Sequence, residues 1–114
     1  MTVARLTSKF IVSALLKRLT AAGGHGAVLA RGDADAGGII LACADKGQIS
    51  ALLELAYDLD GRMTWRACFV QAIESKEKFD IYLSGRREND PDLWVVELDI
   101  PAAERFAADF VSEG

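Results

Sequence analysis

Residues 49–70 read ISALLELAYDLDGRMTWRACFV, and this stretch decides whether the middle of the chain is helical or extended. The Leu, Ala and Glu content of its first nine residues favours a helix by intrinsic propensity. Alternation favours a strand instead, because apolar residues occupy every second position from Ile49 to Tyr57. Asp58-Leu59-Asp60-Gly61 is a strong turn, and alternation resumes after it. We therefore predict a β-hairpin with strands Ile49–Tyr57 and Met63–Val70.

Two further strands are predicted before this hairpin, at Gly26–Arg31 and Gly38–Ala44. The segment between them, Gly32–Gly37, is rich in residues that favour turns. The second strand is apolar on both parities, which is typical of a central strand that is covered on both faces. A fifth strand is predicted at Leu93–Leu98, where an apolar run follows Pro91, a residue that disfavours helix immediately before it.

Three helices complete the prediction. The first is Ser8–Ala22, with Thr7 or Ser8 as its N-cap and Gly23 and Gly24 at its end. The second is a short helix over Ala72–Gly85, and the third is Pro101–Val111 with Pro101 at the first helical position. Apolar residues at helical spacing are expected to face inward: Phe10, Ile11, Ala14, Leu15, Leu19, Ile73, Phe79, Tyr82, Leu83, Phe106 and Phe110.

The predicted order is thus α-β-β-β-β-α-β-α, in one α+β domain that covers residues 1–114. A length of 114 residues fits a single domain, and the chain contains no internal repeat or low-complexity linker. We expect a mostly antiparallel sheet of about five strands with about three helices. In detail, the sheet is expected to be an antiparallel meander with helices on at least one face.

Charge and composition limit the kinds of molecule that the protein is expected to bind. The formal net charge is −4, from 13 Lys and Arg against 17 Asp and Glu, which makes binding to nucleic acid unlikely. No apolar run approaches the roughly 18 residues that span a bilayer, and the N-terminus lacks the pattern of an export signal. We therefore expect a soluble cytoplasmic protein without a membrane partner. In that compartment Cys43 and Cys68 are expected to be free thiols.

Several segments resemble the DUF1491 family, a group of short uncharacterised proteins from alphaproteobacteria. They are Arg5-Leu6-Thr7-Ser8 with Lys17-Arg18, Ala27-Val28 with Arg31 to Gly37, and Asp90-Pro91-Asp92-Leu93-Trp94-Val95-Val96-Glu97. The last segment is the most distinctive of these. The resemblance implies a bacterial single-domain protein, and it brings no activity, cofactor or known site residue.

The motifs that usually carry chemistry are missing from the sequence. Gly23-Gly24-His25-Gly26 follows a predicted helix and precedes a strand, which is the reverse of a phosphate-binding loop. Three Asp-x-Asp pairs lack the glutamate that completes a calcium loop, and we interpret them as turn residues: Asp33/Asp35, Asp58/Asp60 and Asp90/Asp92. We predict no metal, no cofactor and no catalytic residue. An enzyme that uses Cys43 or Cys68 is the weakest alternative.

Two hypotheses for function follow. The first is a non-enzymatic module for protein interaction, possibly a homodimer, because the apolar strand surface exceeds what three helices can cover. The alternative is a small-ligand site formed by Arg31, Asp33, Asp35 and Trp94, since such a site needs convergent polar groups beside an aromatic ring. Trp65 is expected in the core. For Trp94 both a core position and a contact with a ligand or partner remain open.

Overall fold

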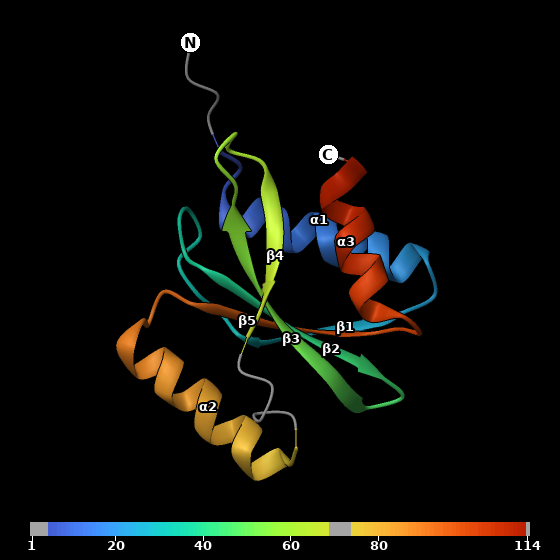
Figure 1. Ribbon diagram of the computed structural model, residues 1–114, viewed down its shortest axis with the longest axis vertical. Helices are drawn as coiled ribbons and strands as arrows, with labels where there is room; N and C mark the ends of the chain where they lie inside the picture. The colour runs from blue at the N-terminus through green and yellow to red at the C-terminus, as the bar shows by residue number, and fades with distance from the viewer. Residues whose placement is uncertain (1–4, 69–73, 114) are drawn as a thin grey trace.

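In the computed structural model, which describes residues 5–68 and 74–113, five strands form one sheet in the spatial order β1-β5-β2-β3-β4 (Figure 1). Three helices join them within that part of the chain, and the order α-β-β-β-β-α-β-α confirms the predicted α+β class. The strands are β1 (His25–Ala30), β2 (Ile39–Asp45), β3 (Gln48–Tyr57), β4 (Met63–Ala67) and β5 (Trp94–Asp99). The helices are α1 (Ser8–Ala21), α2 (Lys76–Asn89) and α3 (Ala103–Glu113).

The predicted meander is right for β2, β3 and β4 and wrong for β1. Strand β3 pairs antiparallel with both β2 and β4. Strand β5 lies between β1 and β2, antiparallel to the first and parallel to the second. The reason is burial, because β2 and β5 carry apolar side chains on both faces and such strands occupy the middle of a sheet. The more exposed β1 is left at the edge.

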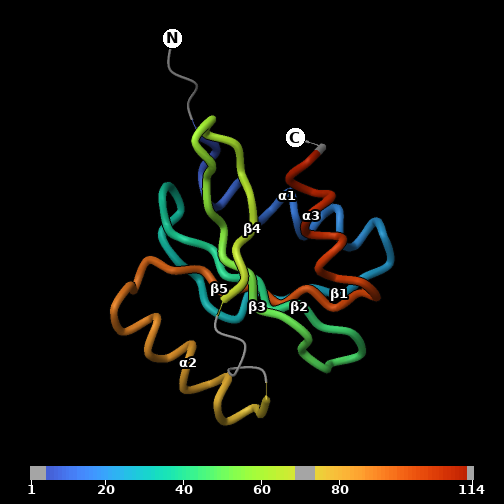
Figure 2. The backbone as a smooth tube through the Cα atoms, in the orientation of Figure 1, coloured from blue at the N-terminus to red at the C-terminus, as the bar shows by residue number. Residues whose placement is uncertain are grey.

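Helices cover both faces of the sheet, with α1 and α3 on one side and α2 on the other (Figures 1 and 2). The larger core lies under α1 and α3, and its buried members are Ile11, Val12, Leu15, Leu19, Ile39, Leu41, Cys43, Trp94, Val96, Leu98, Ala103 and Ala107. The smaller core lies under α2 and contains Ile40, Ala42, Leu52, Phe79 and Leu93. Successive residues of β2 therefore enter different cores, as the alternation of a strand requires.

The predicted hairpin over residues 49–70 is confirmed as β3 and β4. Leu53 pairs with Ala67 and Tyr57 with Met63, so the strands run antiparallel up to the turn. There the Asp58 carboxylate accepts hydrogen bonds from two backbone N–H groups, and Gly61 has a φ of 79°. Burial of alternate residues against the core outweighs the helix propensity of β3. Residues 69 and 70 of the predicted strand lie outside the described residues.

Helix α1 begins where the sequence predicts, because the Thr7 side chain accepts a hydrogen bond from the Phe10 backbone N–H. Gly23, with a φ of 87°, follows its C-terminus. The prediction that Phe10 faces inward is wrong, since this side chain is 56% exposed. The buried stripe instead includes Val12, together with Leu15 and Leu19.

The other two helices have boundaries that differ from the prediction. Helix α2 is capped by Ser75 and continues through Gly85 to Asn89, so the predicted end at Gly85 is wrong. The predicted residues Ala72 and Ile73 lie outside the described residues. Pro101 is not the first residue of α3, because Ala102 follows it with a φ of 57° and the helix starts only at Ala103. A left-handed residue cannot belong to a right-handed helix.

Strand β1 forms an open edge of the sheet. Five of its six residues are exposed and Ala30 is half-buried. The strand contains no charged residue and no proline. Its pairing with β5 is regular from His25 to Val28 and shifts between Val28 and Ala30, where the strand has a bulge. In the described residues no helix has the length and apolar character needed to cross a membrane.

Candidate functional site

The segments that distinguish this sequence meet at one corner of the fold. The acidic turn Gly32–Gly37 lies at the N-terminus of α1, where the backbone N–H groups of Ser8 and Lys9 donate to the carbonyls of Asp35 and Ala34 at 3.2 and 2.9 Å. The first N–H groups of a helix lack intrahelical acceptors, and the turn supplies them. The Asp33 backbone N–H donates to the Asp92 carbonyl at 3.0 Å. We call Gly32–Gly37 together with residues 90–93 the acidic corner.

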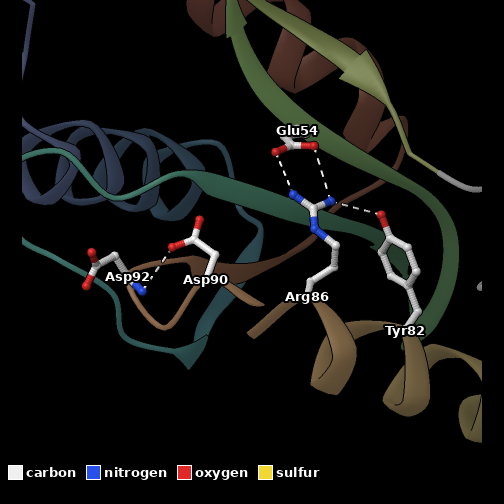
Figure 3. Close-up of polar contacts among 5 residues, drawn as sticks. All are labelled: Glu54, Tyr82, Arg86, Asp90 and Asp92. Carbon is white, nitrogen blue, oxygen red and sulfur yellow. Dashed lines mark hydrogen bonds and ion pairs between the residues drawn. The ribbon is translucent and has the colours of Figure 1, made fainter. Parts of the chain in front are cut away.

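The aspartates of the corner have local partners. One oxygen of the Asp33 carboxylate accepts the backbone N–H groups of Asp35 and Ala36, at 3.1 and 2.9 Å. Asp90 accepts the backbone N–H of Asp92 at 3.2 Å (Figure 3). The interpretation of the aspartate pairs as turn residues is confirmed. Across residues 5–68 and 74–113, no group of three or more His, Cys, Asp and Glu residues is arranged to hold a metal ion.

Two residues of the predicted ligand site, Asp33 and Asp35, lie in this corner, and the other two, Arg31 and Trp94, directly flank its segments in the chain. The indole N–H of Trp94 donates to the Asp33 carbonyl at 2.7 Å, and the Arg31 guanidinium lies 5.4 Å from the centroid of the Trp94 ring. Trp94 is only 2% exposed, as the core alternative expects, whereas Arg31, Asp33 and Asp35 are exposed. The Trp94 indole and the Asp33 carboxylate thus make hydrogen bonds that stabilise the corner. Ligand contact at these four residues stays a prediction.

Arg87 connects α2 to the acidic corner by hydrogen bonds. The sequence did not predict this role. One terminal nitrogen, Nη2, donates to the carbonyls of Arg31 and Pro91, both at 3.2 Å. The side chain comes from the last turn of α2 and is half-buried. Its Nε is fully buried and has no hydrogen-bond partner among the described residues. The sequence shows only two adjacent arginines, because their carbonyl partners are distant along the chain.

A second polar cluster attaches α2 to the sheet. Arg86 makes a two-pronged ion pair with Glu54 of β3, with distances of 2.7 and 3.2 Å, and donates to the Tyr82 hydroxyl at 3.0 Å (Figure 3). These hydrogen bonds, the one to Glu54 above all, raise the pKa of Arg86. The sequence did hold one indication of this cluster. Glu54 is a charged residue among the alternate residues of β3 that face α2. Its geometry indicates a structural role.

Both cysteines are free thiols, as expected. Cys43 is completely buried, and this burial raises the pKa of its thiol to about 12. Burial also raises the pKa of the half-buried Cys68, although the Tyr82 hydroxyl and two arginines lower it in part. The thiolate is the nucleophilic form of cysteine. These environments therefore argue against the alternative of a cysteine enzyme.

Thiol titration gives a direct check of this point. In the Cys68→Ser variant we expect native Cys43 to react with a disulfide reagent at pH 8 roughly a thousandfold more slowly than an exposed thiol. The same variant in guanidinium should react at once, which is the control for reagent and protein. Because the pKa is raised, the thiolate should gain population as the pH rises toward 12. Rapid reaction of native Cys43 at pH 8 would contradict the burial.

A groove runs between α2 and the β1 side of the sheet, and we call it the α2 groove. Its volume is about 650 Å³, and its apolar wall consists of Leu29, Phe79, Leu83 and Val95. Arg87, Glu88, Asp80 and Lys76 line its polar rim. A smaller hollow of about 420 Å³ shares Leu29, Lys76 and Phe79 with it and extends toward Ile49. Strand β1 contributes to the groove because its bulge brings both Leu29 and Ala30 there.

Comparisons with known proteins agree on one family. The family model described as "Protein of unknown function (DUF1491)" matches residues 6–108. A solution structure of a protein from A. tumefaciens is 31% identical with a TM-score of 0.65, and the match covers 85% of this chain and 87% of that one. A crystal structure of a DUF1491 family protein from Caulobacter crescentus is 28% identical with a TM-score of 0.71, covering 90% and 94% of the two chains. No curated protein matches the sequence.

Proposed function

Because the chain belongs to the DUF1491 family, whose function is unknown, we propose a function from its geometry: the domain acts by protein contact, without catalysis, as a homodimer joined along β1. The observation that carries this proposal is the unprotected edge of the sheet. An edge strand presents unpaired N–H and C=O groups, and proteins usually block them with charges, prolines, bulges or a covering element; in β1 the bulge affects only the end of the strand after Val28. Strand β1 has neither charge nor proline. Its side chains Val28 and Leu29 are 42% and 48% exposed.

The opposite edge of the sheet, β4, differs from β1 in its charge and in its attachment to a helix. Strand β4 carries the charged Arg66, and the indole N–H of Trp65 donates to the Ala107 carbonyl of α3 at 2.8 Å. One edge is thus charged and tied to a helix, while the other is open. This asymmetry supports β1 as the contact surface.

A second copy of the chain is the partner that the edge favours. The exposed backbone groups of β1 require another extended strand, and every copy of the protein offers one. A two-fold axis perpendicular to the sheet would pair the two β1 strands antiparallel and extend both sheets into one. No like charges would meet along the pairing, because β1 contains no Lys, Arg, Asp or Glu. The bulge confines regular pairing to His25–Val28.

The proposal is tested by the Val28→Lys variant. We expect the wild-type chain to sediment at twice the mass of one chain at micromolar concentration. A lysine in the edge strand disfavours pairing with another strand, so the dissociation constant should rise by at least roughly tenfold. Val28 is 42% exposed, and a lysine there can extend into solvent without disturbing the monomer.

The matched control is Ile81→Lys, which replaces an exposed apolar side chain with the same residue on α2, away from β1. It should leave the sedimentation of the dimer unchanged. A wild-type chain that stays monomeric up to the highest soluble concentration would refute the homodimer. Equal weakening by both lysines would refute the location of the interface.

Ligand contact at Arg31, Asp33, Asp35 and Trp94 remains the alternative proposal. Its support is that Arg31 lies over the indole ring and that Trp94 and the Asp35 backbone N–H both bind Asp33. The dimer is preferred because Trp94 is buried and the Asp33 carboxylate already accepts two backbone hydrogen bonds.

A further inference from the structure

Arg87 is incompletely neutralised where it borders the α2 groove. Its Nη2 donates to two carbonyls, its Nε is buried without a partner, and it forms no ion pair within residues 5–68 and 74–113. None of the acids near Arg87 in sequence forms an ion pair with it in the described residues. Asp80 pairs with Lys76 at 3.1 Å, Asp90 accepts the Asp92 backbone N–H at 3.2 Å, and the exposed acids are Glu88 and Asp92. A guanidinium has donors that match the geometry of a carboxylate, so an arginine without an ion pair can bind an anion.

The rest of the groove is suited to an aliphatic chain. Its apolar wall of Leu29, Phe79, Leu83 and Val95 lies in the same groove as Arg87. Phe79 and Arg87 are eight residues apart on α2, so the wall extends about 12 Å from the arginine along the helix. The smaller hollow beyond Phe79 continues the same groove toward Ile49.

We propose that the α2 groove binds a small amphipathic monocarboxylate, with its aliphatic chain along the apolar wall and its carboxylate on Arg87. The Nη1 atom of Arg87 is neither hydrogen-bonded among the described residues nor buried, so it is the donor that faces the carboxylate. The acids of the rim select against a second negative charge on the ligand. The groove shares Leu29 and Ala30 with the strand of the proposed dimer, whereas Arg87, Phe79 and Leu83 belong to α2 and lie outside that strand.

Octanoate is the probe for this site, and amide chemical shifts of the ¹⁵N-labelled chain are the measurement. We expect octanoate to shift the amides of Leu29, Phe79, Leu83 and Val95 in a saturable manner. The uncharged octanol should bind at least tenfold more weakly, because a hydrogen bond to a charged group is lost. Octylamine, which has the same chain and the opposite charge, should bind more weakly still.

Two variants locate the carboxylate. Arg87→Gln should weaken octanoate by about tenfold or more and leave octanol unchanged, while Glu88→Gln is the control at the neighbouring position and should not weaken octanoate. If Arg87→Gln fails to fold, the affinities of the wild-type chain for octanoate and octanol decide whether the carboxylate contributes to binding. Equal binding of the two, shifts elsewhere on the surface, or no saturation at millimolar octanoate would each overturn the proposal. So would tighter binding of a peptide with a C-terminal leucine, since the groove would then be a peptide site.

Discussion

The Gly37→Ala variant should lose about 3 kcal/mol of unfolding free energy, although it adds only one methyl group. A Cβ at this position would lie 2.1 Å from the Asp92 carbonyl oxygen and 3.0 Å from the backbone N and O of Asp33. These are backbone atoms, and the Asp33 N–H already donates to the same Asp92 carbonyl. Neither can move without opening the acidic corner. Urea denaturation followed by circular dichroism measures the loss.

Gly85→Ala is the matched control for this experiment. It is the same substitution inside α2, and a Cβ there meets nothing within 4 Å. Removing a glycine from a helix interior should raise the unfolding free energy by roughly 0.5–1 kcal/mol. The two variants are thus expected to have opposite signs. A Gly37→Ala protein as stable as the wild type would mean that the corner is not closely packed in solution.

The Trp94→Phe variant should cost about 2 kcal/mol of unfolding free energy. Two effects add: the smaller ring leaves space in a core where Trp94 is 2% exposed, and the Asp33 carbonyl loses the indole N–H that lies 2.7 Å away. Part of the cost also comes from the guanidinium of Arg31, which loses the indole face beneath it. Chemical denaturation gives the value.

Trp65→Phe is the comparison, since Trp65 also donates through its indole to a backbone carbonyl, that of Ala107. Trp65 is only half-buried, and the Ala107 carbonyl lies inside α3, where it can still accept an intrahelical N–H, so the loss should be about half as large. Equal losses at the two positions would show that the acidic corner adds nothing to an ordinary indole hydrogen bond.

Local patterns predicted most of the elements in this fold because their causes are local. Alternation identified β3 against its helix propensity, and turn residues marked the hairpin. The position of β1 was not predicted, since chain neighbours usually pair and nothing in β1 itself names its partner. The strand order was indicated instead by β2 and β5, the two strands that are apolar on both faces. Their shared character fits neighbours at the centre of a sheet.

The site was predictable only in part, for a related reason. Arg31, Asp33, Asp35 and Trp94 were chosen as a group, and the fold brings them together. Arg87 was missed because the predicted second helix ended at Gly85, which left the arginine outside any element. Its carbonyl acceptors belong to Arg31 and Pro91, in two other segments. Pairing over such sequence distances depends on tertiary structure alone.

The central place of β5 also sets an order of events during synthesis. While the ribosome has released only α1 through β4, the three-stranded β2-β3-β4 unit can already pair, although β2 still lacks β5 on its other side. Within the described residues β5 is the sole strand that pairs with β1, so until it emerges the nascent β1 has no partner in its own chain. Closing the sheet then requires a parallel insertion between segments that were made much earlier, which is a slow kind of step. During that interval an apolar, uncharged strand is open to chaperones or to another nascent copy.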